Sequence, residues 1–255
     1  MKILCIHGSY GSASAFRTQL EPFLATVEKP GEIDFKFIDG IYPATPPEGF
    51  QDYYGPGPHY LNTQFDGTAG LETLQHKLRT IKPGENYEDT IKELVKNNAT
   101  VISKGNYMKT FDYIEQLLTE DPEIQGLLGY SEGATTAATY LLLQARRHQE
   151  EGTPHRVKFG IFFAGWPPTR FEGDRLVPIL PDEDDDAIID VPTCHVVGCS
   201  DPYLYGAMTL FRVCDEDTAT LFDHGKGHTL PRDPRTITEL SDSINTTLKH
   251  AGLLS

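Results

Sequence analysis

Short apolar runs alternate along the chain with segments in which apolar residues recur every three or four positions. The apolar runs lie at 3–6, 33–39, 124–130, 157–165, 192–198 and 219–223. Several of them are apolar almost throughout, which is typical of strands buried on both faces of a parallel sheet. The helix-like segments between them lie at 16–27, 108–118, 134–147 and 234–248. The alternation predicts an α/β fold with a mostly parallel central sheet and helices on both faces.

Two prolines give a more local signal within these helical segments. Asp233 precedes Pro234, so we expect Asp233 to cap the last helix and Pro234 to occupy its first turn. Pro22 lies inside the first helical pattern, where it predicts either a kink or the effective start of that helix.

The region 40–105 departs from the alternation. Residues 40–70 are rich in proline, glycine and aromatic residues, and 71–104 predicts one or two polar helices. No linker or internal repeat divides the chain, so we expect one domain over 1–255 with a lid-like insertion at 40–105. Insertions of this size are often lids or binding loops. A surface excursion without a role is the alternative.

Composition and charge exclude several classes of function. The 255 residues carry a net charge of −15 and the pI is about 4.9, which disfavours binding to nucleic acid and to anionic membranes. No apolar run is long enough to span a bilayer, and the first apolar run is too short for a signal peptide, so we expect a cytoplasmic protein. The four cysteines lack metal-ligand spacing, and we expect them to be reduced.

Ser131 is the candidate nucleophile. It lies in the motif Gly129-Tyr130-Ser131-Glu132-Gly133, between an apolar run and a helical pattern. In a nucleophile elbow the serine occupies a strained turn between a strand and a helix, and small residues are needed two positions to either side. The motif alone is a weak signal, and its strand–helix context strengthens it.

A serine nucleophile needs a base, and in this arrangement the chain order is serine, acid, histidine. The segment FDHGKGHTLP offers His224 and His228. We favour His228, because two glycines before it let the loop turn inward, and His224 is the alternative. A metal site built on this pair is disfavoured because no third ligand is evident.

Asp201 is the candidate acid. It follows the apolar run 192–198 and precedes His228 by 27 residues. A carboxylate there would orient the imidazole and stabilise the imidazolium. An Asp-Pro turn is the alternative reading, and the competing acids Asp190 and Asp223 are less well placed at strand ends.

The segment CIHGSYGSAS after the first apolar run is the candidate oxyanion loop. We expect the backbone N–H of Ser9, or less favourably of Tyr10, to bind an oxyanion together with the backbone N–H of Glu132. His7 then has a structural role. The chemistry requires no metal and no organic cofactor.

Four segments together resemble the fungal FSH family of serine hydrolases, within the α/β-hydrolase superfamily. They are LCIHGSYGSASAFRTQLEPF, GYSEGA, GCSDPY and GKGHTLP. The likeness runs from Lys2 to about residue 250, and DGIYPATPPEGFQDYYGPGPHYL also resembles the family's segment after the second strand. The region 66–105 matches less clearly, and we expect substrate choice to lie there.

The resemblance implies an α/β-hydrolase fold and hydrolysis of a carboxylic ester or thioester through an acyl-enzyme. Some members of the family are thioesterases that release acyl chains from the acyl carrier domain of fungal polyketide synthases, and we expect that activity here. The alternatives are a carboxylesterase for a small secondary-metabolite ester and a catalytically inactive binding protein. The oligomeric state is not predicted.

Aromatic residues of the insertion suggest a sizeable acyl group. The candidate substrate-binding residues are Tyr10, Tyr42, Tyr60 and Tyr130, and Phe50, Tyr53 and Tyr54 accompany them in the insertion. Two interpretations stay open: the insertion aromatics line the acyl-binding cleft, or they only pack the insertion.

Overall fold

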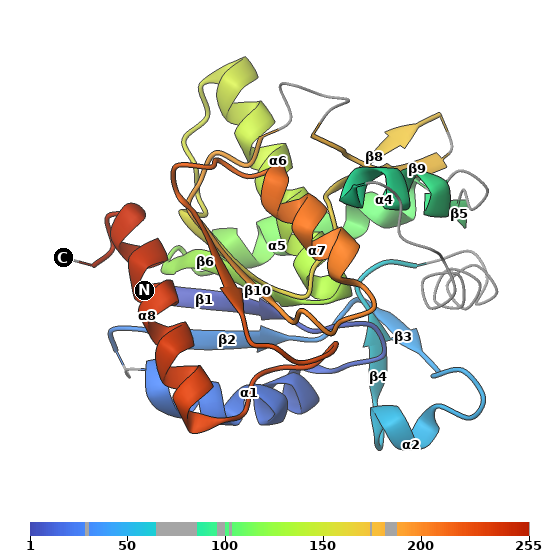
Figure 1. The fold of residues 1–255 in the computed structure, drawn as a ribbon. Helices are drawn as coiled ribbons and strands as arrows, with labels where there is room; N and C mark the ends of the chain where they lie inside the picture. Colours follow the sequence, from blue (N-terminus) through green and yellow to red (C-terminus); the bar gives the residue numbers. More distant parts are fainter. Residues whose placement is uncertain are drawn as a thin grey trace.

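The structure is a computed structural model, and it describes residues 1–28, 31–64, 86–95, 100–101, 104–173, 175–181 and 188–254 (Figure 1). The described helices are α1 (Ala13–Val27), α2 (Gln51–Tyr54), α4 (Tyr87–Val95), α5 (Lys104–Glu120), α6 (Glu132–Glu151), α7 (Leu204–Arg212) and α8 (Pro234–His250). The described strands are β1 (Lys2–Ile6), β2 (Asp34–Ile38), β3 (Tyr42–Ala44), β4 (His59–Leu61), β5 (Thr100–Val101), β6 (Ile124–Tyr130), β7 (Phe159–Phe163), β8 (Thr169–Glu172), β9 (Arg175–Pro178), β10 (Thr193–Val197) and β11 (Ala219–Asp223).

A six-stranded sheet forms the centre of the molecule, in the order β11-β10-β7-β6-β1-β2. Every neighbouring pair in it is parallel. Each of the six apolar runs overlaps one of these strands, so the predicted α/β architecture with a parallel central sheet is confirmed. Because the strands are parallel, their carboxyl ends and the loops that follow them meet at one edge.

The two faces of the sheet bury separate apolar clusters. Along β1, Leu4 and Ile6 face the cluster built with α5, α6 and α7, whereas Ile3 and Cys5 face the cluster built with α1 and α8. This alternation is the period of two that a strand imposes on its side chains. Figure 1 shows α1 and α8 side by side on one face and α5, α6 and α7 on the other.

The caps of the first and last helices follow from their sequences. The Asp233 side chain accepts the Thr236 N–H at 3.1 Å and Pro234 opens α8, as predicted. Helix α1 begins one residue after Ser12, whose hydroxyl accepts the Ala15 N–H. Pro22 therefore lies within α1 and does not mark its start.

The insertion contains an antiparallel β3–β4 hairpin with α2 between its strands, followed by α4 and β5. The polar helices predicted at 71–104 fall partly on 65–85, 96–99 and 102–103, which lie outside the described residues. A further antiparallel pair, β8–β9, joins β5 in a three-stranded sheet, and the apolar pattern did not predict it.

Figure 1 shows both small sheets on the side toward which β1 and β2 point, where they cover the carboxyl edge. Within the described ranges, every helix is too short or too polar to cross a bilayer.

Candidate active site

Ser131 occupies the turn between β6 and α6. Its backbone has φ 54° and ψ −118°, a conformation that non-glycine residues rarely adopt. The Ser131 N–H donates to the Phe163 carbonyl at 2.9 Å, which fixes the turn against β7. The hydroxyl makes no cap bond to its helix, so it is free to face the loops at the sheet edge.

The two glycines of the motif are required by close backbone packing. A Cβ at Gly129 would lie 2.4 Å from the Ala134 Cα, and a Cβ at Gly133 would lie 2.1 Å from the Ile6 carbonyl oxygen. Backbone atoms cannot move aside to relieve such a clash, whereas the end of a flexible side chain can. The strand–turn–helix crossing at Ser131 therefore needs both glycines.

The structure brings Ser131, His228 and Asp201 together in one hydrogen-bonded chain. The Ser131 Oγ lies 3.1 Å from His228 Nε2, and His228 Nδ1 lies 2.8 Å from Asp201 Oδ2. An imidazole protonated on Nδ1 donates to the carboxylate and leaves Nε2 to accept the serine proton. Asp201 is buried, and its other oxygen accepts the Tyr203 N–H at 2.8 Å.

Two tyrosine rings hold the His228 imidazole. The Tyr203 ring meets it edge-on with centroids 4.8 Å apart, and the Tyr130 ring lies at 5.3 Å. The Tyr130 hydroxyl also donates to the His228 carbonyl at 3.2 Å. Burial raises the pKa of Tyr130 well above its usual range, so this phenol stays a neutral donor.

His224, the alternative base, and His7, expected to be structural, both have other hydrogen-bond partners. The His224 Nδ1 accepts the Lys226 N–H at 3.3 Å, and its hydrogen bonds do not reach Ser131 or Asp201 among the described residues. His7 is buried, and its Nε2 accepts the Gly40 N–H at 2.8 Å. Burial lowers the pKa of both imidazoles, so both are neutral near pH 7.

The competing acids have structural roles. Asp190 pairs with His155 at 3.1 Å, away from the elbow. Asp223 accepts the N–H groups of Cys199 and Gly225 at 2.9 and 2.8 Å. It therefore links the loop that carries Asp201 to the loop that carries His228, a role that the sequence did not reveal.

The loop after β1 lies directly against the elbow. A Cβ placed on Gly8 would lie 3.3 Å from the Ser131 Cβ, so Gly8 packs closely against the elbow. Ser9 is the next residue in this loop. The backbone N–H groups of Ser9 and Glu132, the two predicted oxyanion donors, have no acceptor among the described residues. Tyr10, the less favoured donor, has φ 59°, which marks a sharp bend in this loop.

The Glu132 side chain joins three segments. Its Oε2 accepts the Ser9 hydroxyl at 2.9 Å, and its Oε1 accepts the N–H groups of Asn62 and Thr63 at 3.0 and 2.8 Å. The Asn62 side chain in turn donates to the His7 carbonyl at 2.7 Å. Burial is the main cause that raises the pKa of Glu132 to about 7. The sequence motif pointed to the Glu132 N–H but gave no sign of this side-chain network.

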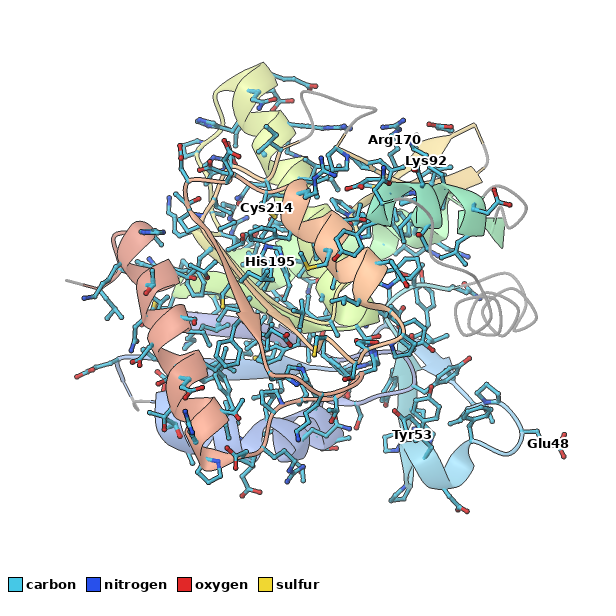
Figure 2. The ribbon with its side chains drawn as sticks, in the orientation of Figure 1. Glu48, Tyr53, Lys92, Arg170, His195 and Cys214 are labelled. Atoms are coloured by element: carbon cyan, nitrogen blue, oxygen red, sulfur yellow. The ribbon has the colours of Figure 1, made fainter. Side chains whose placement is uncertain are left out.

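A cavity of about 730 Å³ opens onto Ser131 and His228. Its aromatic lining consists of Tyr10, Phe50, Tyr53, Tyr54, Tyr107, Tyr130, Trp166 and Tyr203. Trp166 and Tyr107 come from regions in which sequence reasoning proposed no site. Tyr53, labelled in Figure 2, projects from α2 at the edge of the molecule and is 72% exposed.

Of the four candidate substrate-binding residues, Tyr10 and Tyr130 line this cavity. Tyr42 and Tyr60 are not among its lining residues. The Tyr42 hydroxyl donates to the Asn106 carbonyl at 2.5 Å, and the Tyr60 backbone N–H donates to the Gly11 carbonyl at 2.9 Å. These two tyrosines therefore hold the hairpin to its surroundings.

A strained serine elbow at the carboxyl edge of a parallel sheet, with a histidine and an acid on later loops, is characteristic of the α/β-hydrolase fold, and the chain has that fold. The family model described as "Serine hydrolase (FSH1)" matches residues 1–240. The chain belongs to this family and is a serine hydrolase, which confirms the predicted family and enzyme class.

Individual relatives agree with this assignment. The chain is 28% identical over 253 residues to "Esterase FUS5" of Gibberella moniliformis, covering 97% of this chain and 87% of the relative. It is 24% identical over 240 residues to "Hydrolase phiM" of Talaromyces stipitatus, covering 93% and 83%. The solved structure of esterase PE8 covers 97% of this chain and 92% of its own, with a TM-score of 0.52 and 14% identity. That structural likeness supports the fold alone.

Proposed function

We propose that this serine hydrolase is a thioesterase that releases a polyketide-type acyl chain from an acyl carrier domain. The observation that carries the proposal is the cavity of about 730 Å³ beside Ser131, whose lining includes eight aromatic side chains. Cavities of this size hold whole drug-sized molecules, and aromatic walls favour extended or ring-containing acyl groups.

The proposed mechanism follows from the hydrogen-bonded chain Ser131–His228–Asp201. His228 Nε2 takes the hydroxyl proton as the Ser131 Oγ attacks the thioester carbonyl carbon, and Asp201 stabilises the resulting imidazolium. The backbone N–H groups of Ser9 and Glu132 bind the oxyanion. The thiolate leaves with the proton from His228, and His228 then activates a water that hydrolyses the acyl-enzyme.

Arg232 supports a carrier-bound substrate. It is the one Lys or Arg among the described residues that line the cavity, in a chain of net charge −15. No ion pair of Arg232 is present within the described part of the chain, so its guanidinium is available to a ligand. The arm of a carrier domain bears a phosphate, and a guanidinium binds phosphate well.

A direct test compares three substrates with the same aromatic acyl group: a carrier-bound thioester, a short N-acetylcysteamine thioester and an ethyl ester. The proposal predicts the highest kcat/KM on the carrier-bound thioester and the lowest on the ethyl ester. Arg232→Gln should raise KM roughly threefold or more for the carrier-bound substrate only, because the short surrogate lacks the phosphate. A preference for the ethyl ester would overturn the thioesterase proposal.

A carboxylesterase is the second candidate. It is favoured by the printed names of relatives such as "Esterase FUS5". The same comparison separates the two, because an oxygen esterase would hydrolyse the ethyl ester at least as well as the thioesters and would show no dependence on Arg232.

A further inference from the structure

Glu132 lies where three parts of the site meet. In the proposed acyl-enzyme mechanism only its backbone N–H takes part. Its carboxylate accepts one hydrogen bond from the loop after β1, through the Ser9 hydroxyl, and two from the end of β4, through Asn62 and Thr63. Both Asn62 and Thr63 are buried. One side chain therefore links the elbow, the Ser9 loop and the β3–β4 hairpin.

The hairpin is attached to the Ser9 loop at further points. The Tyr60 N–H donates to the Gly11 carbonyl, His59 Nδ1 lies 2.9 Å from the Tyr10 carbonyl, and Asn62 bonds the His7 carbonyl. The hairpin and the loop thus form one unit, and Glu132 connects that unit to α6.

Oxyanion stabilisation depends on donors that are held in place before the reaction begins. One proposed donor, the Ser9 N–H, lies in a loop that bends sharply at Tyr10. The other donor is the N–H of Glu132 itself. A displacement of the loop by as little as 1 Å would separate the two donors and cost roughly 10²-fold in rate.

We propose that the Glu132 side chain is a positioning residue that holds the Ser9 loop and the β3–β4 hairpin against the nucleophile elbow, and so sets the spacing of the two oxyanion donors. This inference rests on the acyl-enzyme mechanism proposed above. Glu132 acts through Ser9 and touches no reacting atom with its carboxyl group.

The charge of Glu132 adds a second, opposite effect. An ionised carboxylate beside the oxyanion hole opposes the negative charge of the tetrahedral intermediate, whereas a protonated one does not. The raised pKa of about 7 puts this change near neutral pH. The titratable groups near Glu132 include Tyr107 on α5, His7 in the Ser9 loop and the His228–Asp201 pair. The same cavity is also lined by Tyr10, Tyr130, Tyr203 and Arg232.

The variants Glu132→Gln and Glu132→Ala distinguish the positioning role of the Glu132 side chain from the effect of its charge. In Glu132→Gln the amide oxygen can accept the Asn62 and Thr63 N–H groups, and the amide N–H can donate to the Ser9 hydroxyl oxygen. In Glu132→Ala all three contacts are lost.

Gln144 provides a matched control on the same helix. Its side chain also makes three hydrogen bonds to a loop, to the N–H groups of Arg156 and Val157 and to the Val157 carbonyl. It lies about 18 Å along α6 from Glu132. Gln144→Ala therefore removes an equivalent set of contacts without disturbing the oxyanion donors.

The experiment measures kcat and KM on the N-acetylcysteamine thioester from pH 5.5 to 8.5, with fluorophosphonate labelling of Ser131 and thermal unfolding for each variant. We expect Glu132→Ala to lower kcat by about 10- to 100-fold while KM changes by less than about threefold. Glu132→Gln should restore at least about a third of kcat at pH 6. Its kcat relative to the unchanged protein should rise by about threefold or more as the pH increases through 7.

Ser9→Ala probes the same contact from the other partner. It should lower kcat about 3- to 10-fold, and the combined Ser9→Ala and Glu132→Ala change should cost less than the product of the two single effects. If Glu132→Ala does not fold, Ser9→Ala alone tests the inference, and an unchanged kcat in Ser9→Ala would overturn it.

Any one of three results would overturn this inference and leave the proposed function standing. They are equal kcat losses in Glu132→Ala and Glu132→Gln, a comparable kcat loss in Gln144→Ala, and independent effects of the changes at positions 9 and 132. Absence of Ser131 labelling and of hydrolysis in the unchanged protein would overturn the proposed function, and the inference with it.

Discussion

The carboxyl edge of the sheet is built from two regions that are held in place in different ways. The catalytic loops follow β6, β10 and β11, and hydrogen bonds of the sheet and its turns fix them. The covering elements, which are the β3–β4 hairpin with α2 and the β8–β9 pair, are separate small sheets.

Side chains and loop contacts attach this cover to the rest of the molecule. Asn62 and Glu132 fasten the hairpin, and Tyr107 with its Thr169 contact fastens β8 to α5. The loops that carry Ser131, Asp201 and His228 therefore continue directly from strands of the main sheet, whereas the cover is joined to that sheet through a few side-chain contacts and the Tyr60–Gly11 backbone bond. Substitutions near Ser131, Asp201 and His228 should therefore change kcat or stability, whereas substitutions in the cover should mainly change substrate binding.

The largest effects are expected at His228 and Asp201. Removal of the base by His228→Ala should lower kcat about 10⁵- to 10⁶-fold, and Asp201→Asn about 10⁴-fold because it leaves the imidazole in the wrong tautomer. Steady-state hydrolysis of an aromatic acyl thioester measures both. His224→Ala, from the same loop, should keep kcat within about tenfold, and a larger loss there than in His228→Ala would assign the base to His224.

Backbone crowding at the elbow should give the next largest effect. Gly133→Ala places a Cβ 2.1 Å from the Ile6 carbonyl oxygen, and we expect it to lower the free energy of unfolding by about 3 kcal/mol or more. Gly152→Ala, at the other end of α6, has φ 69° and open space around its Cβ, so it should cost about 1–2 kcal/mol. Denaturant unfolding compares the two, and equal costs would contradict the crowding at the elbow.

Glu132 stands between the two regions and gives a pH-dependent prediction for stability. Its pKa rises from an ordinary value of 4.5 to about 7 in the folded protein. Between these two values the unfolded chain releases a proton that the folded protein keeps. The free energy of unfolding should therefore fall as the pH rises from 4.5 to 7, by at most about 1.4 kcal/mol per pH unit from this group.

Glu132→Gln removes that slope. The variant should gain stability relative to the unchanged protein as the pH rises through this window, and the difference should be constant above pH 8. Urea unfolding at pH 5, 6, 7 and 8 measures it. A stability difference that does not vary with pH would show that Glu132 titrates alike in the folded and unfolded protein.

Substitutions in the cover should have the smallest effects, and these effects should appear in KM. Tyr54 lines the cavity, and Tyr54→Leu should raise KM about 3- to 10-fold for an aromatic acyl thioester through the lost ring contact. The effect on kcat should be smaller. Tyr42→Phe, which alters only the bond to the Asn106 carbonyl outside the cavity, should change KM by less than about twofold. Similar KM changes in both variants would contradict the proposed placement of the acyl group.

The same division explains what could be predicted from the sequence. The convergence of Ser131, Asp201 and His228 could be predicted because each follows an apolar strand, and parallel strands bring such loops to one edge. The glycines beside Ser131 were interpretable because the turn itself requires small residues. Each of these signals lies in a short stretch of sequence. The rule that parallel strands end at the same edge of a sheet brings the stretches together.

The cover could not be predicted in the same way. Strands β8 and β9 are four residues each and are not continuously apolar, so they lack a strong periodic signal. Tyr42 and Tyr60 were chosen by composition, yet whether a tyrosine faces the cavity depends on the pairing of β3 with β4 and of Tyr60 with Gly11. The Glu132 network likewise joins residues 70 and 123 positions apart, a separation that no local pattern records.

The central claim is that the hydroxyl at position 131 becomes covalently acylated during turnover. Rapid quenching of the protein with an aromatic acyl thioester, followed by peptide mass spectrometry, tests it directly. The account predicts one acyl group per chain, located on Ser131, appearing within a single turnover and absent from Ser131→Ala. Hydrolysis that persists in Ser131→Ala, or turnover without any acyl adduct on Ser131, would contradict it.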